Sequence, residues 1–167
     1  MAWMLLVSIA AAAPAAASAY TPLDLDRCRV IARVEEGESI SWRCPGLAGI
    51  PLFVSSGDGR FDLDAGIDNG EWESLPQFNR PGPRVEWRRR SGRPFAVIYR
   101  LVTAGADQRP GSVLGVETIG RQARPGCLIA LIGGALPNAN ALARDIADRR
   151  APTFRCGRDS VTRHGMD

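Results

Sequence analysis

The four cysteines constrain the fold of this chain more than any other feature. They stand at Cys28, Cys44, Cys127 and Cys156, and no two of them are spaced as Cys-x-x-Cys. This spacing argues against a zinc cluster built from close cysteine pairs and against a thioredoxin-type redox motif. An even number of cysteines in an exported chain instead predicts two disulfides, for which three connectivities exist.

The chain begins with an apolar segment that indicates export. Residues 1–19 are interpreted as a signal peptide, because the uncharged run Ala2 to Ala13 is followed by Pro14 and by the small-x-small pattern Ala17-Ser18-Ala19. We expect cleavage after Ala19, although the basic residues that usually precede the apolar run are missing. The alternative is an uncleaved membrane anchor, for which the run is about as short as a span can be. A periplasmic or secreted protein is expected, with membrane contact only through the signal segment before cleavage.

Residues 20–167 are predicted to form a single disulfide-stabilised domain with a flexible tail at 157–167. Apolar and polar residues alternate in runs that are separated by turn residues, which predicts β-hairpins. The predicted strand pairs are Arg29–Val34 with Ser39–Arg43, Ile50–Val54 with Arg60–Leu63, Val85–Arg89 with Phe95–Val102, and Ser112–Ile119 with Cys127–Ile132. The irregular stretch 66–83 is predicted to be a long loop.

The strand pattern favours local cysteine pairing, Cys28 with Cys44 and Cys127 with Cys156. If Val34 pairs with Ser39, Cys28 lies one residue away from its partner, and a bulge or small register shift would bring the sulfur atoms into reach. The second bridge would tie a short edge strand, 153–156, back to the sheet.

One α-helix is predicted from about Asn138 to Arg149, where Leu142 and Ile146 lie one turn apart. The small residues Ala139, Ala143 and Ala147 would let it lie close to a sheet. The predicted fold class is therefore α+β: a mostly antiparallel, twisted β-sheet built from hairpins, with one C-terminal α-helix packed on it and two disulfides.

Arginines are concentrated in residues 84–100, around the turn of the third hairpin. The formal net charge of +3 is too small to predict a nucleic-acid partner. Alternation of side chains places Arg88 and Arg90 on one face and Arg89 on the other, so a solvated hairpin end is expected. The alternative is a surface for an anionic partner, which Arg84, Arg88 and Arg100 would form if their faces coincide. The candidate binding residues are Arg84, Arg88, Arg89, Arg90, Arg100 and Trp72, whose ring could stack on a sugar.

Signals for catalysis are weak. The single histidine, His164, lies in the tail, where a positioned base is not expected. Nothing places two carboxylates face to face for glycoside hydrolysis. The carboxylate candidates are Glu71, Glu73, Glu86 and Glu117. A calcium loop starting at Asp62 is an alternative, but Ile67 stands where such a loop requires glycine. No catalytic residue, metal or cofactor is predicted, and enzymatic activity is not favoured.

Several stretches of the chain resemble a family of exported, uncharacterised alphaproteobacterial proteins. They are the leader, YTPLDLDRC, WRCPGLAGIPLFV, PRVEWR with PFAVIYR, and the late helix before FRC. The resemblance spans nearly the whole mature chain and implies a single exported domain, without an activity or site residues.

The predicted function is that of a small, non-enzymatic binding module of the cell envelope. Its partner would be a protein, an envelope polymer or a small anionic ligand. Two alternatives stay open: a carboxylate-dependent hydrolase of envelope material, and an inhibitor of a foreign hydrolase that uses the 66–83 loop.

Overall fold

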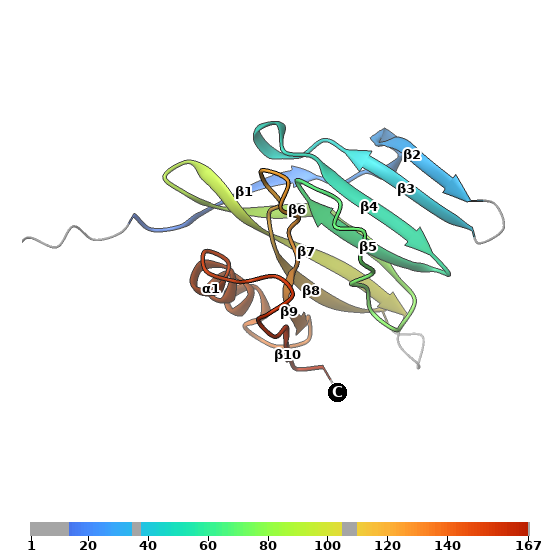
Figure 1. Ribbon diagram of the computed structural model, residues 1–167. Helices are drawn as coiled ribbons and strands as arrows, with labels where there is room; N and C mark the ends of the chain where they lie inside the picture. Colours follow the sequence, from blue (N-terminus) through green and yellow to red (C-terminus); the bar gives the residue numbers. More distant parts are fainter. Residues whose placement is uncertain (1–13, 35–37, 105–109, 167) are drawn as a thin grey trace, which may run out of the picture.

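The computed structural model describes residues 14–34, 38–104 and 110–166, which form two β-sheets and one α-helix (Figure 1). The six-stranded sheet has the order β1-β6-β7-β8-β9-β10 and the four-stranded sheet the order β2-β3-β4-β5. The elements are β1 (Ala17–Pro22), β2 (Arg29–Val34), β3 (Ser39–Cys44), β4 (Leu52–Gly57), β5 (Arg60–Ala65), β6 (Asn79–Arg90), β7 (Arg93–Ala104), β8 (Pro110–Thr118), β9 (Leu128–Gly133), α1 (Ala139–Arg150) and β10 (Thr162–His164).

The elements stack in three layers, with α1 and the four-stranded sheet on opposite sides of the six-stranded sheet (Figure 1). One core lies between the sheets and includes Leu52, Val54, Trp87 and Tyr99. The other lies under the helix. The predicted α+β class with mostly antiparallel pairing and one C-terminal helix is confirmed. The hairpins, however, divide between two sheets, whereas one sheet was expected.

The third predicted hairpin forms the centre of the molecule. The second strand of this hairpin, β7, pairs with both β6 and β8. Its residues Val97 and Tyr99 belong to the inter-sheet core, whereas Ala96 and Ile98 pack under the helix. A strand that is apolar on both faces is buried on both faces, so its central position follows directly from its sequence.

The first disulfide depends on a bulge in β2. Val34 pairs with Ser39 as predicted, and a register shift between Val30 and Ala32 then sets Arg29 opposite Arg43. The shift places Cys28 directly opposite Cys44, with a Cα–Cα distance of 4.5 Å, and the two are bonded. The bulge therefore brings Cys28 opposite Cys44, as the predicted pairing of these two cysteines requires.

The second disulfide joins Cys127 to Cys156, the other predicted pair, across a Cα–Cα distance of 5.8 Å. The predicted edge strand at 153–156 is wrong, because these residues form turns. Within the segment 157–167, for which a flexible tail was predicted, Thr162–His164 form β10, which pairs in parallel with β9. The Arg150 guanidinium fixes this tail by donating to the Ser160 carbonyl at 2.7 Å and to the Thr162 hydroxyl at 2.8 Å.

Two other segments differ from expectation. The predicted loop 66–83 ends earlier, because β6 begins at Asn79. The segment Ala17–Pro22 forms strand β1 on β6, so the expected cleavage after Ala19 falls inside a strand.

The two disulfides indicate the kind of cellular compartment in which the protein folds. Two disulfides are typical of an oxidising, extracytoplasmic environment. In the part of the chain that the structure describes, no helix has the length and apolar character needed to cross a membrane.

Candidate functional site: an arginine pocket at the start of the helix

A bulge in β6 creates the pocket. Between the pairs Pro81–Leu101 and Val85–Tyr99, residues 82–84 oppose Arg100 alone. Gly82 permits this close approach, because a Cβ atom there would lie only 3.3 Å from the carbonyl oxygen of Arg100. Bulges of this kind re-aim side chains next to functional sites. Here Arg84 and Arg100 come to line the same hollow.

The hollow has a volume of about 180 Å³. It lies at the N-terminal end of α1, because Asn140 of the first helical turn belongs to its wall. The apolar lining comes from the sheet, at Ile98 and Leu114. The polar lining includes Tyr20, Arg84, Arg100 and Asn140. An engineered apolar cavity of about 150 Å³ holds benzene, so this pocket fits a ligand of about six to ten non-hydrogen atoms.

The two arginines of the pocket have only neutral partners in the described part of the chain. Arg100 donates from Nη1 to the Ser112 hydroxyl at 2.6 Å and from Nη2 to the Asn140 side-chain oxygen at 3.3 Å. The Arg84 guanidinium carbon lies 6.0 Å from the centroid of the Tyr20 ring. Arginine binds carboxylate or phosphate through paired donors, and neither side chain has such a group beside it here.

Glu86, the one acidic residue among the described residues that line the pocket, is already neutralised. Glu86 accepts from Arg144 Nε at 2.7 Å and from Arg144 Nη2 at 3.2 Å. It also accepts from the Ser18 hydroxyl. The Arg144 guanidinium in turn donates to the Tyr20 hydroxyl at 3.1 Å, and bonding to Glu86 raises the pKa of Arg144 above its usual value. The pocket therefore presents uncompensated positive charge.

Arg88 does not belong to the pocket, and the expectation of a solvated hairpin end is wrong for it. Its side chain is buried, and it donates to both carboxylate oxygens of Asp148 on α1, at 2.8 and 2.6 Å. It also donates to the Ser18 hydroxyl at 2.5 Å. The hydrogen bond to Asp148 raises the pKa of Arg88 further. Arg88 thus fastens the helix to the sheet.

The other predicted binding residues are dispersed. Arg90 donates to the Asp148 carbonyl at 3.1 Å and lies over the Phe95 ring, 5.1 Å from its centroid. Arg89 is half-buried and does not line the pocket. Trp72 is exposed, and its ring lies near Gly57 of the four-stranded sheet. The structure therefore brings together only Arg84 and Arg100 of the six candidates.

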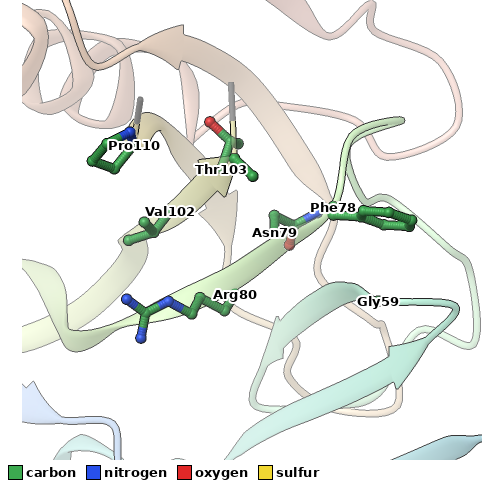
Figure 2. A pocket seen from close by; sticks show the side chains of 8 residues that line it. Gly59, Phe78, Asn79, Arg80, Val102, Thr103 and Pro110 are labelled. Carbon is green, nitrogen blue, oxygen red and sulfur yellow. The ribbon is translucent and has the colours of Figure 1, made fainter. Parts of the chain in front are cut away.

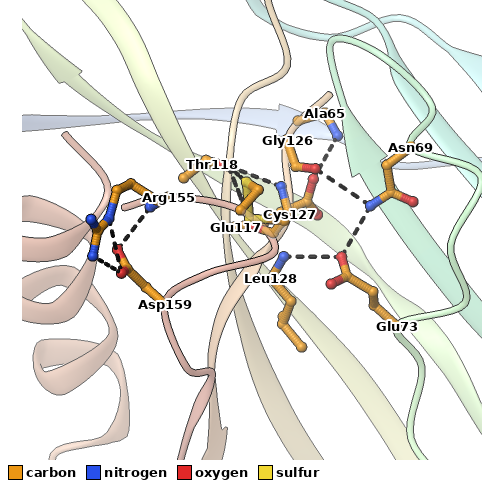
Figure 3. Close-up of a disulfide and its surroundings, with 11 residues drawn as sticks. Ala65, Asn69, Glu73, Glu117, Thr118, Gly126, Cys127, Leu128, Arg155 and Asp159 are labelled. Carbon is orange, nitrogen blue, oxygen red and sulfur yellow. Dashed lines mark hydrogen bonds and ion pairs between the residues drawn. A yellow bond between two sulfur atoms is a disulfide. The ribbon is translucent and has the colours of Figure 1, made fainter. Parts of the chain in front are cut away.

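A group of buried carboxyls lies on the other side of the six-stranded sheet. Burial raises the pKa of Asp62 to about 7 and that of Asp64 to about 8, and repulsion from neighbouring carboxylates adds to both shifts. Burial also raises the pKa of Glu117 well above its usual value. Glu117 accepts a hydrogen bond from the Ala65 amide at 3.1 Å (Figure 3). The main influences on the pKa values of these three carboxyls are burial, neighbouring carboxylates and backbone hydrogen bonds, and none of them is a cation.

The four carboxylates that the sequence offered as catalytic candidates lie in different surroundings. Glu73 accepts from the Leu128 amide at 3.0 Å and from the Asn69 side chain at 3.0 Å, so it fixes a loop to the sheet (Figure 3). Glu86 is held in ion pairs, Glu117 is buried, and Glu71 is exposed. Within residues 14–34, 38–104 and 110–166, no group of His, Cys, Asp and Glu side chains is arranged to hold a metal ion.

A second hollow of about 340 Å³ lies beside Phe78, Arg80, Val102 and Pro110 (Figure 2). Phe78 is 65% exposed, so this region offers an apolar surface. Its wall includes Ala104 and Pro110, which flank residues outside the described ranges. Among the described residues of its wall there is one arginine, so the paired guanidinium groups of the first pocket are not found in that part of it.

Sequence reasoning missed Tyr20 and Asn140, which join the two arginines in the pocket. Both positions depend on long-range packing, of β1 on β6 and of α1 on the sheet, and no local pattern signals them. Comparison of the chain with protein-family models, curated proteins and solved structures found no match.

Proposed function

We propose that this protein is an exported, non-enzymatic binding module of the cell envelope that holds a small carboxylate ligand in the Arg84–Arg100 pocket. The main support for this proposal is that Arg100 lines a pocket of ligand size and has only neutral hydrogen-bond partners in the described part of the chain. The ligand's carboxylate would accept hydrogen bonds from Arg84 and Arg100. Its apolar body would lie against Ile98 and Leu114, so the ligand class is a small monocarboxylate with an aliphatic or aromatic group.

Two features support binding over catalysis. The described residues that line the pocket include no free carboxylate or imidazole, because Glu86 is paired and His164 lies on β10 beside Thr162. The carboxyls with raised pKa values are buried on the far side of the sheet. The hydrolase alternative is therefore the weaker candidate. The inhibitor alternative also loses its main support, because Glu73 bonds the 66–83 segment to β9.

Titration with benzoate, butyrate and inorganic phosphate tests this function. We expect calorimetry to show benzoate and butyrate binding with a Kd of about 1 mM or tighter, which corresponds to about 4 kcal/mol. Arg100→Gln and Arg84→Gln should each weaken benzoate binding about tenfold, because each removes one charge-assisted contact. Benzamide, which has the same shape without the charge, should not bind.

The matched control is Arg163→Gln, because Arg163 is exposed on β10 and does not line the pocket. This variant should bind benzoate like the parent protein. Equal binding of benzoate and benzamide, or unchanged affinity in both pocket variants, would contradict the carboxylate site. Phosphate binding without benzoate binding would contradict the apolar part of the ligand class.

Export is tested separately by fusing the chain to a reporter that is active only outside the cytoplasm. We expect reporter activity that depends on residues 1–19, together with a secreted chain that contains no free thiol. Reduced cysteines in the native protein would contradict an oxidising location.

A further inference from the structure

A larger groove lies beyond the C-terminal end of α1, away from the arginine pocket at its N-terminal end. Its volume is about 800 Å³, which is within the range of ligand-binding clefts. The second disulfide borders the groove, because Cys156 belongs to its wall. Residues from β7, from the turn between β8 and β9, and from the segment after the helix meet here.

The groove combines aromatic rings with arginines. Phe95 and Phe154 are half-buried, and each ring has a guanidinium over it: Arg90 at 5.1 Å from the Phe95 centroid and Arg150 at 5.0 Å from the Phe154 centroid. Arg121, Arg124 and Arg155 supply the charged part of the lining. Among the described residues that line the groove, none is acidic.

Arg121 and Arg124 have no acidic hydrogen-bond partner in the described part of the chain, whereas Arg155 has one. Arg155 is bonded to Asp159 through both its side chain and its backbone amide (Figure 3). Arg121 donates to the Pro94 carbonyl, which is neutral. Arg124 makes only backbone hydrogen bonds, to Arg121, in the described part of the chain. The groove therefore has two guanidinium groups available to an anion.

The turn that carries these arginines is strained. Arg121 and Arg124 are joined by backbone hydrogen bonds in both directions, at 2.8 and 2.9 Å, across the two residues Gln122 and Ala123. Both central residues have positive φ, 51° and 61°, where Asn and Gly are the usual residues. Such strain in non-glycine residues is found preferentially at ligand-binding sites.

The turn also holds like charges together. Directly opposite residues of an antiparallel pair point to the same face, and like charges in these positions are destabilising. An anion bound between Arg121 and Arg124 would remove this repulsion. Strain and repulsion therefore coincide at the rim of this groove, whose lining combines aromatic rings with arginines.

We propose that this groove binds an extended acidic segment of a partner protein, separately from the ligand of the Arg84–Arg100 pocket. Carboxylates of the segment pair with Arg121 and Arg124, and an apolar side chain between them packs against Phe95 and Phe154. A phosphate polymer would use the arginines but leave the rings without a partner. The net charge of +3 is low for a nucleic-acid-binding domain.

The test is fluorescence anisotropy with a labelled peptide of sequence Asp-Glu-Phe-Asp-Glu-Leu. We expect the double variant Arg121→Ser/Arg124→Ser to bind at least tenfold more weakly than the parent protein. The single variant Arg124→Ser should weaken binding about threefold or more, and it removes no side-chain bond within the protein. A peptide with alanine in place of phenylalanine should also bind at least threefold more weakly.

The charge-matched control is Arg29→Ser/Arg43→Ser, since these exposed arginines face each other across β2 and β3. This control should keep the parent affinity. The proposal is overturned by unchanged affinity in both groove variants, by an equal loss in the control, or by no peptide binding to the parent. Tighter binding of a single-stranded oligonucleotide or of polyphosphate than of the peptide would assign the groove to that other class.

Discussion

The two faces of the six-stranded sheet handle buried charge in opposite ways. On the helix side, Arg88 pairs with Asp148 and Glu86 pairs with Arg144. On the side that faces the four-stranded sheet, Asp62, Asp64 and Glu117 lie buried, and the influences on them that raise their pKa values are burial and other carboxylates.

This difference has a physical consequence for each face. A buried charge with a bonded partner stays charged, whereas a buried carboxyl without a cation gains stability by taking up a proton. The helix side therefore stays charged and polar across the physiological pH range. The inter-sheet side makes the stability of the fold depend on pH.

The largest effect should come from pH. The folded-state pKa values of Asp62 and Asp64 are raised to about 7 and about 8, so the unfolded chain loses these protons at lower pH than the folded protein does. The contribution of these two carboxyls to the free energy of unfolding is therefore highest below about pH 4 and falls as the pH rises toward 8. We expect a loss of roughly 4 kcal/mol between pH 5 and pH 8, measured by urea unfolding.

Asp64→Asn should flatten this pH dependence and stabilise the protein at pH 8 by about 2 kcal/mol, because it removes an ionisation that burial disfavours. Glu71→Gln is the matched control, since Glu71 is exposed in the same segment and is not among the main influences on the pKa of Asp62 or Asp64, so its profile should follow the parent. A parent profile that rises from pH 5 to pH 8 would contradict the contrast between the two faces.

The next largest effect on stability is expected from the buried ion pair between Arg88 and Asp148 on the helix side. Arg88→Met removes a buried cation and leaves Asp148 without its partner, so we expect a loss of about 3 kcal/mol in the free energy of unfolding. Arg149→Met on the same helix removes an exposed pair with Asp145, for which about 0.5 kcal/mol or less is expected. Similar losses in the two variants would show that Arg88 is not a buried anchor.

The sequence could predict the strands and the helix but not the charge pairing on the two faces of the sheet. Hairpins, helix and disulfides follow from alternation, turn residues and cysteine spacing, which are local signals. Alternation of side chains predicted Arg88 and Arg90 on one face, and a patch of Arg84, Arg88 and Arg100 only if their faces coincide. It could not show that Asp148 lies 2.6 Å from Arg88, or that Arg100 has only neutral hydrogen-bond partners in the described part of the chain, because helix docking decides both.

The same limit applies to the chain ends. Polar composition predicted a loose tail, but the backbone groups of 162–164 complete the free edge of β9. The pattern Ala17-Ser18-Ala19 suits a signal peptidase and also suits an edge strand of small residues on β6. One short sequence satisfies both requirements, so only the folded context reveals the second.

A third prediction concerns Ser18, which belongs to the charge network on the helix side of the six-stranded sheet. Its hydroxyl bridges Glu86 and Arg88, and hydrogen bonds to charged groups are the stronger ones. In a chain that retains this residue, Ser18→Ala should lower the free energy of unfolding by about 1.5 kcal/mol. Ser41→Ala, which breaks only the neutral bond to Ser55, should cost about 1 kcal/mol or less.

The intact mass of the exported protein shows which chain is present. If cleavage follows Ala19, the mature protein starts at Tyr20, and the Ser18 variant should then match the parent in stability after processing. A chain that retains Ser18 and is unaffected by its replacement would contradict the charge network on the helix side.

The smallest effect compares one substitution at two strained positions. Ala123 and Ala48 both have positive φ, 61° and 53°. Ala123 lines the groove, whereas Ala48 lies in the turn before β4. Leu47, next to Ala48, packs on the inter-sheet core. Glycine relieves about 1–2 kcal/mol of strain and loses about 0.5–1 kcal/mol through chain entropy. Each variant should therefore gain about 0.5 kcal/mol in unfolding free energy. If the strain at Ala123 positions Arg121 and Arg124 for the acidic peptide, Ala123→Gly should also weaken peptide binding, whereas Ala48→Gly should leave it unchanged. Equal peptide affinity in the two variants would mean that the strained turn serves the fold alone.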